Sequence, residues 1–252
     1  MKVADSIAIV TGGNRGIGEG FVHVLLEAGA RKVYVGTRVP SAADHLAQEF
    51  AKRAVPVQLD VTDDAQVAAA AENCSDVNIV INNAGLFLNE TLMGAPDMSA
   101  ARQEMDVNYF GTLSMCRHFA PVLKRNGGGA IVNVLSAGGI VAVPNMGGYS
   151  PSKFAARALS TNVRAELADQ GTQVASLIVG SVDTRMASHV QGKKEPPEAI
   201  AKAGIKAIEK DISEMDTDEF AINVRAALAR DPASVERQMA AALKLDVLST
   251  GR

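Results

Sequence analysis

The sequence predicts an α/β protein built on one doubly wound parallel sheet with helices on both faces. Short apolar runs rich in Val and Ile alternate with helical stretches along most of the chain. Each run is apolar over its whole length, as strands buried on both faces of a parallel sheet are. The chain has 252 residues, of which 47% are hydrophobic and 21% charged, and this suffices for one such domain.

The elements follow in a regular order. Strands are expected at residues 7–10, 32–35, 55–59, 78–81, 130–134 and 173–179, and helices between them at 16–28, 41–52, 63–73, 98–125 and 150–169. Residues 181–196 show no clear period and predict a loop. Helices are expected again at 197–211, 218–230 and 232–243, and prolines stand at the starts of the first and the last. We therefore expect a single domain over 1–252, with a substrate-loop region at about 181–204.

Composition excludes several classes of function. A net charge of −3 and the lack of a basic cluster argue against nucleic acid as a partner. No apolar segment is long enough to span a membrane, and the N-terminus lacks the apolar core of a signal peptide, so we expect a cytoplasmic protein. The cysteines and histidines lack metal-ligand spacing, so no metal is expected: Cys74, Cys116, His23, His45, His118 and His189.

A glycine-rich turn follows the first predicted strand. Its sequence is Thr11-Gly12-Gly13-Asn14-Arg15-Gly16-Ile17-Gly18, and a helix is expected directly after it. Glycines allow a tight turn that approaches a pyrophosphate closely, and the free N–H groups of the helix start attract its negative charge. Such a turn can also serve the fold alone. Its position after the first strand favours a nucleotide site.

The end of the second strand indicates which nucleotide is bound. Sites that prefer NAD place an acidic residue there for the ribose 2′-hydroxyl, whereas this chain has Gly36-Thr37-Arg38. Arg38 and Arg15 can each pair with a 2′-phosphate through several N–H donors. Each arginine alone would be read as a solvated surface charge. The two together, without a competing carboxylate, predict NADP(H) as the cofactor.

A proton-transfer site is indicated by Tyr149 and Lys153, with Ser136 upstream. A phenol is a weak acid, with a pKa of about 10. A lysine four residues later on a helix lies one turn away, and its positive charge favours the phenolate. A half-buried tyrosine beside a solvated lysine is the alternative. With Ser136 to hold a substrate oxygen, the group is suited to an alcohol or a carbonyl.

Together these motifs resemble the short-chain dehydrogenase/reductase family and its Rossmann-type sheet. The resemblance extends from about residue 5 to 186. It rests on the glycine turn, on Asn82-Asn83-Ala84-Gly85 after the fourth strand, on Asp60 after the third, and on the positions of the family's catalytic tetrad: Asn108, Ser136, Tyr149 and Lys153. One departure is Val179-Gly180, where the family usually has Pro-Gly. The lost proline predicts a looser turn before the substrate loop.

The resemblance implies a role for each residue. Tyr149 would be the acid/base, Ser136 would bind the substrate oxygen, and Asn108 would keep a water in a proton relay toward Lys153. Lys153 would lower the pKa of Tyr149 and bind the nicotinamide ribose. The residues expected to contact the cofactor are Gly12, Asn14, Arg15, Gly16, Ile17, Gly18, Thr37, Arg38, Asp60, Val61, Asn83, Ala84, Gly85, Tyr149, Lys153, Gly180, Val182 and Thr184.

The expected reaction is reversible reduction of a ketone or aldehyde by NADPH. In the family the helices that correspond to about 98–125 and 150–169 pair between subunits, so the resemblance also implies a homotetramer or homodimer. The substrate is expected to be an uncharged, fairly hydrophobic small molecule, because the candidate pocket walls are apolar: Leu86, Phe87, Leu88, Met93, Ala137, Gly138, Met146 and Met186. Two alternatives are a carrier-linked 3-oxoacyl reductase and a non-catalytic NADP-binding regulator. The first would need a basic patch near the mouth of the active site, and Lys193-Lys194 offers only a small one. Asp60 has a second interpretation as a helix cap, and Asn82 and Asn83 as turn residues.

Overall fold

The computed structural model describes residues 1–188 and 190–250, and side chains through residue 241. Seven parallel strands form one sheet in the order β3-β2-β1-β4-β5-β6-β7. The strands are β1 (Ile7–Thr11), β2 (Lys32–Thr37), β3 (Ala54–Gln58), β4 (Ile79–Asn82), β5 (Gly129–Val134), β6 (Thr172–Ile178) and β7 (Glu214–Asp216). The order reverses between β1 and β4, and this is where doubly wound sheets bind ligands. The predicted fold class is confirmed.

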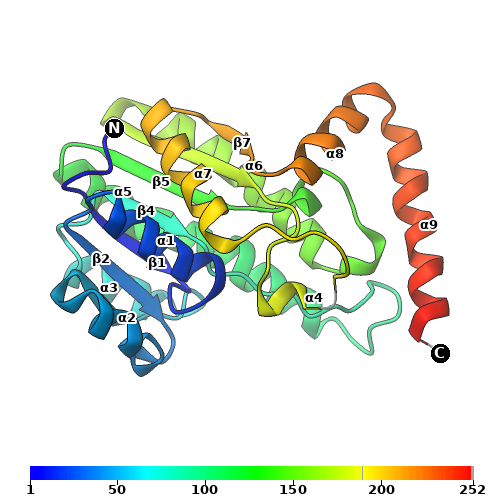
Figure 1. Cartoon of the computed structure of the whole chain (residues 1–252), viewed down its shortest axis with the longest axis horizontal. Coiled ribbons are helices and arrows are strands. Elements are labelled where there is room, and N and C mark those ends of the chain that lie inside the picture. The colour runs from blue at the N-terminus through cyan, green and yellow to red at the C-terminus, as the bar shows by residue number, and fades with distance from the viewer. Residues whose placement is uncertain (189, 251–252) are drawn as a thin grey trace.

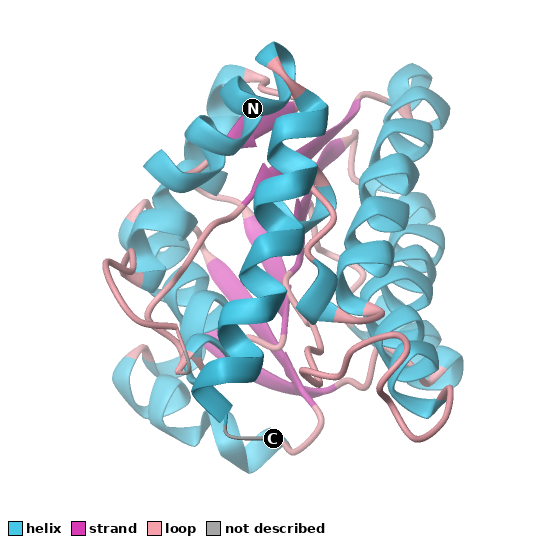
Figure 2. Ribbon diagram, turned by 90° about the vertical axis from the view of Figure 1, so that its right-hand side faces the viewer, coloured by secondary structure: helices cyan, strands magenta, loops and turns pink. Residues whose placement is uncertain are grey.

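Helices cover both faces of the sheet (Figures 1 and 2). They are α1 (Gly16–Glu27), α2 (Asp44–Glu49), α3 (Asp64–Asn73), α4 (Ser99–Met105), α5 (Thr112–Arg125), α6 (Tyr149–Glu166), α7 (Pro197–Lys210), α8 (Glu219–Arg230) and α9 (Pro232–Thr250). Prolines begin α7 and α9 as predicted. Figure 1 shows α9 at the side of the molecule, away from the sheet.

Alternate residues of each strand enter different cores, because successive side chains of a strand point to opposite faces. Ala8 and Val10 of β1 pack with α1 and α7, in a cluster that includes Phe21. Ile7 and Ile9 pack on the other face with α3, α5 and α6. Burial on both faces explains why these strands read as continuous apolar runs.

The long helix predicted at 98–125 is interrupted part-way along its length. A π-helical turn, Asp106–Gly111, separates α4 from α5. Gly111 lies against Val61, where an added Cβ would come within 2.6 Å of Val61 Cγ2. Asn108, a predicted site residue, lies inside this turn and is buried. Such turns occur often at functional sites.

Two further predictions about elements were wrong. The helix expected at 41–52 is split into 3₁₀ turns around the short α2. Strand β7 was missed, because it has only three residues and two of them, Glu214 and Asp216, are acidic. Their carboxylates pair with Arg157 and Arg225, at 2.7 Å and 2.6 Å, so the edge strand is held by ion pairs as well as by its ladder.

Candidate active site and cofactor site

The glycine turn lies between β1 and α1, as predicted. Gly12 and Gly16 have φ of 61° and 55°, in the left-handed region that glycine adopts without strain. An added Cβ on Gly18 would overlap the Gly12 carbonyl and lie 2.6 Å from Asn83 Nδ2. The start of α1 has no side-chain cap, so its N–H groups remain open to a ligand. The turn therefore has the shape and the donors of a phosphate cradle.

The segment after β4 holds this turn in place. Asn83 Nδ2 donates to the carbonyls of Thr11 and Gly12 at 2.9 Å and 3.2 Å. Thr11 Oγ1 in turn accepts from the backbone N–H groups of Asn83 and Ala84, both at 2.9 Å. Asn83 is thus a brace for the turn. Its neighbour Asn82 is buried and donates to Asn133 at 2.8 Å, away from the turn.

Positive charge gathers beside the glycine turn. Burial lowers the pKa of the Arg15 guanidinium, and the nearby charges of Arg185 and Arg38 lower it further. Three guanidinium groups that repel one another favour an anion between them. Arg38 was predicted for this role, whereas Arg185 was missed because it lies inside the irregular segment after β6. The 2′-phosphate that distinguishes NADP from NAD fits this charge pattern.

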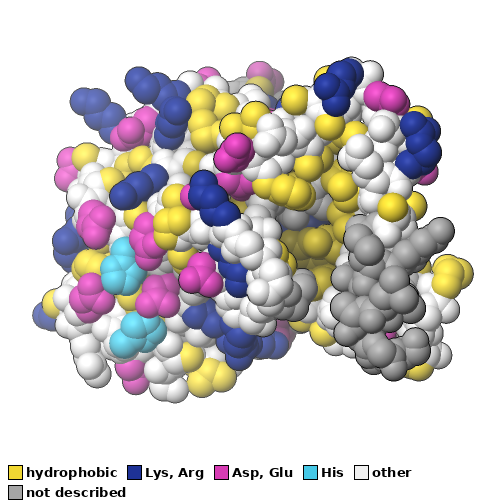
Figure 3. All heavy atoms as spheres, turned by 45° about the vertical axis from the view of Figure 1, so that its right-hand side comes forward, with side chains coloured by type: hydrophobic (Ala, Val, Ile, Leu, Met, Phe, Trp, Pro, Cys, Tyr) yellow, Lys and Arg dark blue, Asp and Glu magenta, His cyan; other side chains and the backbone are white. Residues whose placement is uncertain are grey.

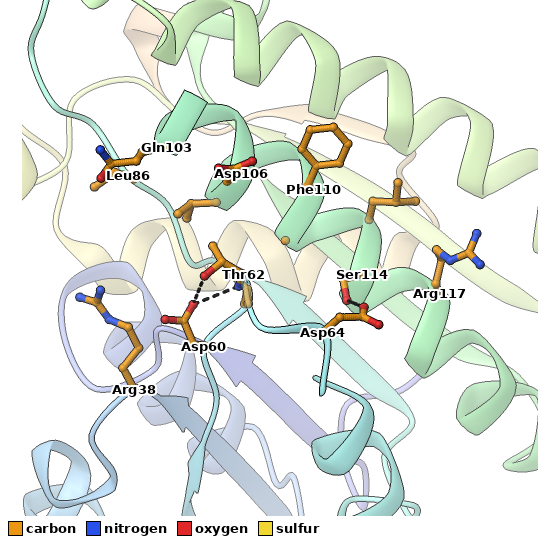
Figure 4. Close-up of a pocket in the computed structure, with 14 residues that line it drawn as sticks. Arg38, Asp60, Thr62, Asp64, Leu86, Gln103, Asp106, Phe110, Ser114 and Arg117 are labelled. Atoms are coloured by element: carbon orange, nitrogen blue, oxygen red, sulfur yellow. Dashed lines mark hydrogen bonds between the residues drawn. The ribbon is translucent and has the colours of Figure 1, made fainter. Parts of the chain in front are cut away.

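A groove with a volume of about 800 Å³ runs from the ends of β2 and β3 to α5. Figure 4 shows Arg38 and Asp60 on one side of it and Arg117 on the other. Asp60 Oδ1 accepts from the N–H and hydroxyl of Thr62 at 3.0 Å and 2.8 Å. The cap of α3 is Asp63, so the interpretation of Asp60 as that helix cap was wrong. Val61, one of the expected cofactor contacts, also lines the groove.

The segment after β6 returns to the glycine turn. Thr184 Cγ2 lies 3.2 Å from the position of an added Cβ on Gly16, so the predicted cofactor residues meet. Val182 pairs with Glu195 in an isolated parallel bridge. The N–H of Gly180 donates to Asp218 at 2.7 Å. This bond restrains the turn that we expected to be loose because it lacks the family's proline. The sequence did not indicate this role for Asp218.

The four candidate catalytic residues converge at the carboxyl ends of β4 and β5. Tyr149 begins α6, and Lys153 lies one turn later with its Nζ 5.6 Å from the centre of the Tyr149 ring. Lys153 Nζ donates to the Val134 carbonyl at 3.0 Å. Ser136 forms a hydrogen bond with Tyr149. Gly85 lies between Asn108 and Lys153, since its added Cβ would be 3.4 Å from Asn108 Oδ1 and 3.7 Å from Lys153 Nζ.

Burial is the largest influence on the ionisation of Tyr149. Burial raises the pKa of its phenol, the hydrogen bond from Ser136 lowers it, and the Glu104 carboxylate raises it, with a raised pKa as the result. Burial also lowers the pKa of Lys153 to about 8. Because desolvation outweighs the other influences, Tyr149 stays protonated at neutral pH. A buried phenol of this kind is equipped to donate a proton.

The side chain of Asn108 is fully engaged. Its Oδ1 accepts from Leu86 N at 2.8 Å, and its Nδ2 donates to Leu86 O and Ser152 Oγ, both at 2.9 Å. Asn108 therefore connects the loop after β4 with α6. Its predicted place in a proton relay stays a prediction.

The comparison with known proteins decides the family. Residues 6–195 match the family model described as short chain dehydrogenase. The chain belongs to the short chain dehydrogenase family. It is 40% identical to a short chain dehydrogenase from Burkholderia cenocepacia J2315 whose crystal structure is a complex with NADP, with a TM-score of 0.90 over 95% of this chain and 99% of that one.

More distant members of the family carry specific names. The chain is 31% identical to a 3-alpha-(or 20-beta)-hydroxysteroid dehydrogenase of Mycobacterium tuberculosis, over 75% of this chain and 74% of that protein. A 3-ketoacyl-(acyl-carrier-protein) reductase from Brucella melitensis, complexed with NADH, is 25% identical, with a TM-score of 0.78 over 85% of this chain and 95% of that one. These relatives establish an oxidoreductase of the short chain dehydrogenase family.

Proposed function

We propose that the protein reduces an uncharged, hydrophobic ketone or aldehyde to an alcohol, with NADP(H) as its cofactor, and that the reaction is reversible. The observation that carries the proposal is the meeting of Tyr149, Ser136 and Lys153 at the carboxyl end of β5. The chain is an NADP-dependent oxidoreductase of its family. The arginine group beside Gly16 supports NADP over NAD.

In the proposed mechanism the protein binds the carbonyl oxygen and supplies its proton. NADPH, when bound, supplies the hydride. Ser136 and Tyr149 donate hydrogen bonds to the oxygen, where negative charge develops as the carbon is reduced. Tyr149 then transfers its proton to that oxygen as a general acid. Lys153 places its positive charge beside the phenolate that remains and stabilises it.

The neighbours of Tyr149 support a hydrophobic substrate. The Phe87 ring packs edge-on against the Tyr149 ring, with 5.2 Å between the ring centres. Met146 Sδ and Tyr149 lie within 4 Å of an added Cβ on Gly138. Figure 3 shows hydrophobic side chains gathered in a hollow on one face of the molecule. A relative named for hydroxysteroids agrees with a substrate of this kind.

The two alternative functions are less well supported. Lys193 pairs with Glu195 at 3.1 Å and Lys194 lies 4.0 Å from Asp183, so carboxylates accompany both lysines of the small basic patch that an acyl carrier would meet. A non-catalytic regulator would not require Ser136, Tyr149 and Lys153 to be assembled.

Among the described residues no helix is long and apolar enough to cross a membrane. A single catalytic domain over 1–252, a cytoplasmic location and a homotetramer or homodimer complete the proposal.

A panel of hydrophobic ketones and aldehydes, assayed with NADPH and with NADH, tests the proposal. Turnover with NADPH is expected on at least one ketone, and Tyr149→Phe is expected to abolish it while leaving coenzyme binding intact. Absence of turnover on every carbonyl, or equal turnover by the variant, would contradict the catalytic role. Faster reduction with NADH would contradict the coenzyme preference.

A further inference from the structure

We propose that Glu104 is a positioning residue for Tyr149, because its buried carboxylate ties the start of the catalytic helix α6 to the substrate-facing loop after β4. Glu104 lies on α4, and its side chain is only 1% exposed. A carboxylate is rarely buried to this extent without a specific set of donors. The inference rests on the proposed acid role of Tyr149.

The groups around the Glu104 carboxylate come from both segments. Leu88 N donates to Glu104 Oε1 at 2.8 Å, and the backbone amides of Gly148 and Tyr149 lie beside the carboxylate, where they oppose the rise in its pKa that burial causes. Gly148 precedes α6, whose start has no side-chain cap of its own. Glu104 therefore places a negative charge beside the N–H groups that this helix start leaves open, and it does so from a different helix.

On the side of the loop, Glu104 acts together with Asn108, one helical turn away. Glu104 binds Leu88, and Asn108 binds both polar groups of the Leu86 backbone. The residue between them is Phe87, whose ring meets the Tyr149 ring at 5.2 Å and 64°. Two polar side chains thus fix the backbone on either side of the aromatic ring that covers the candidate acid.

The same pair also binds the first turn of α6. Asn108 donates to Ser152 Oγ at 2.9 Å, and Ser152 Oγ donates to the carbonyl of Tyr149 at 2.6 Å. Glu104 lies beside the backbone amide of Tyr149, and Asn108 acts on the Tyr149 carbonyl through Ser152. Side chains of a single helical path therefore meet both ends of the Tyr149 backbone.

The space around Gly148 is too small for a side chain. An added Cβ there would lie 2.6 Å from Ala101 Cα and 2.9 Å from Glu104 Oε2. Glycine at this position lets α4 approach the start of α6 closely enough for the carboxylate to reach the N–H groups. The contact therefore depends on residues from both helices.

Glu104 also acts on the phenol through its charge. The groups that face Tyr149 are Lys153 on its own helix, Ser136 at the end of β5, and Glu104 on α4. Glu104 is a cause of the raised pKa of Tyr149, after burial. The pKa of Glu104 itself is raised by burial and, to a smaller extent, by the charge of Glu90. Removal of the negative charge should lower the pKa of the phenol.

Glu104→Gln separates the effect of the Glu104 charge on the phenol from a purely structural role, because the substitution removes the charge and keeps an oxygen acceptor. The chain has no Trp and only three tyrosines, so its tyrosinate absorbance can be followed directly, and the difference from Tyr149→Phe isolates Tyr149. We expect Glu104→Gln to move the ionisation of Tyr149 to lower pH, by on the order of one unit. The alkaline limit of carbonyl reduction should move by the same amount.

Glu104→Ala tests the positioning, and Val163→Ala is its control. Val163 is buried near the other end of α6, so its truncation destabilises the helix without touching Tyr149. We expect Glu104→Ala to reduce kcat by about tenfold or more with NADPH affinity unchanged, and Val163→Ala to change neither kcat nor the ionisation. An unmoved ionisation in Glu104→Gln, or a similar kcat loss in both alanine variants, would overturn the proposal. If the wild-type protein reduces no carbonyl, the proposed function fails, and the tyrosinate titration still tests Glu104.

Discussion

The backbone N–H of Gly180 donates to the carboxylate of Asp218 over 2.7 Å, across 38 positions of the chain. The same carboxylate accepts from Ala221 N at 3.0 Å and caps α8. It also accepts from the Thr217 hydroxyl at 2.9 Å. One buried acid therefore connects the C-terminal helices with the start of the substrate loop.

Asp218→Ala should destabilise the fold and weaken the coenzyme site together. Loss of a helix cap and of a buried acceptor costs about 2 kcal/mol, measured by urea unfolding. We expect the KM for NADPH to rise, because Thr184 follows Gly180 and lies against the glycine turn. Asp231→Ala is the control, since Asp231 accepts from Ser234 N at the start of α9 and makes no hydrogen bond with the described residues of the loop. An equal rise in KM for this control would argue against the role of Asp218.

Arg38→Asp should shift the coenzyme preference from NADPH to NADH. The substitution removes one charge-assisted contact with the 2′-phosphate and places a carboxylate where a ribose hydroxyl needs an acceptor. One such contact contributes about 1.5–3 kcal/mol, so NADPH affinity should fall by roughly 10- to 100-fold. Binding of both coenzymes by calorimetry gives the ratio. An unchanged ratio would mean that Arg38 does not bind the 2′-phosphate.

Gly18→Ala should remove coenzyme binding with much less effect on the remainder of the sheet. The added Cβ would overlap the Gly12 carbonyl and press on Asn83 Nδ2 at 2.6 Å, so the turn cannot keep its shape. Gly171→Asn is the control. Gly171 has φ of 71° and open space around it, and asparagine tolerates this conformation. Titration with NADPH should show binding lost in the first variant and kept in the second.

Lys153→Met should inactivate the enzyme and yet stabilise the coenzyme-free fold near neutral pH. The folded-state pKa of Lys153 is about 8, below its unfolded value, so burial of the charged form costs stability. That cost is fully present below pH 8 and disappears as the pH rises toward about 10.4. The gain in Tm should thus be largest near pH 7 and vanish at high pH. Thermal unfolding across this range checks it, and a lower Tm for the variant at pH 7 would refute it.

The strands and the glycine turn could be predicted because their signals are local. A buried parallel strand must be apolar along its length, and a phosphate turn needs glycine at fixed spacing. The edge strand β7 lacks this apolar signal, because it carries the acidic Glu214. The charge of Glu214 is compensated by Arg157, which comes from a helix distant in the sequence. The π turn around Asn108 also has no local signature.

Part of the site depends on contacts between distant segments. Glu104 reads as an ordinary helix residue until α6 and the loop after β4 are placed beside it. Asp218 gains its role only when Gly180 lies next to it. The raised pKa of Tyr149 has the same origin, because burial is a property of the fold and the sequence shows only the lysine nearby.

The mutual repulsion of Arg15, Arg38 and Arg185 has a consequence for coenzyme choice in solution. Small anions from the medium relieve this repulsion, and a coenzyme phosphate must displace them as it binds. The affinity for NADP should therefore decrease as ionic strength rises, whereas NAD, which lacks the 2′-phosphate, competes with fewer anions. The ratio of the affinities for NADP and NAD should therefore depend on the salt concentration in which the enzyme works.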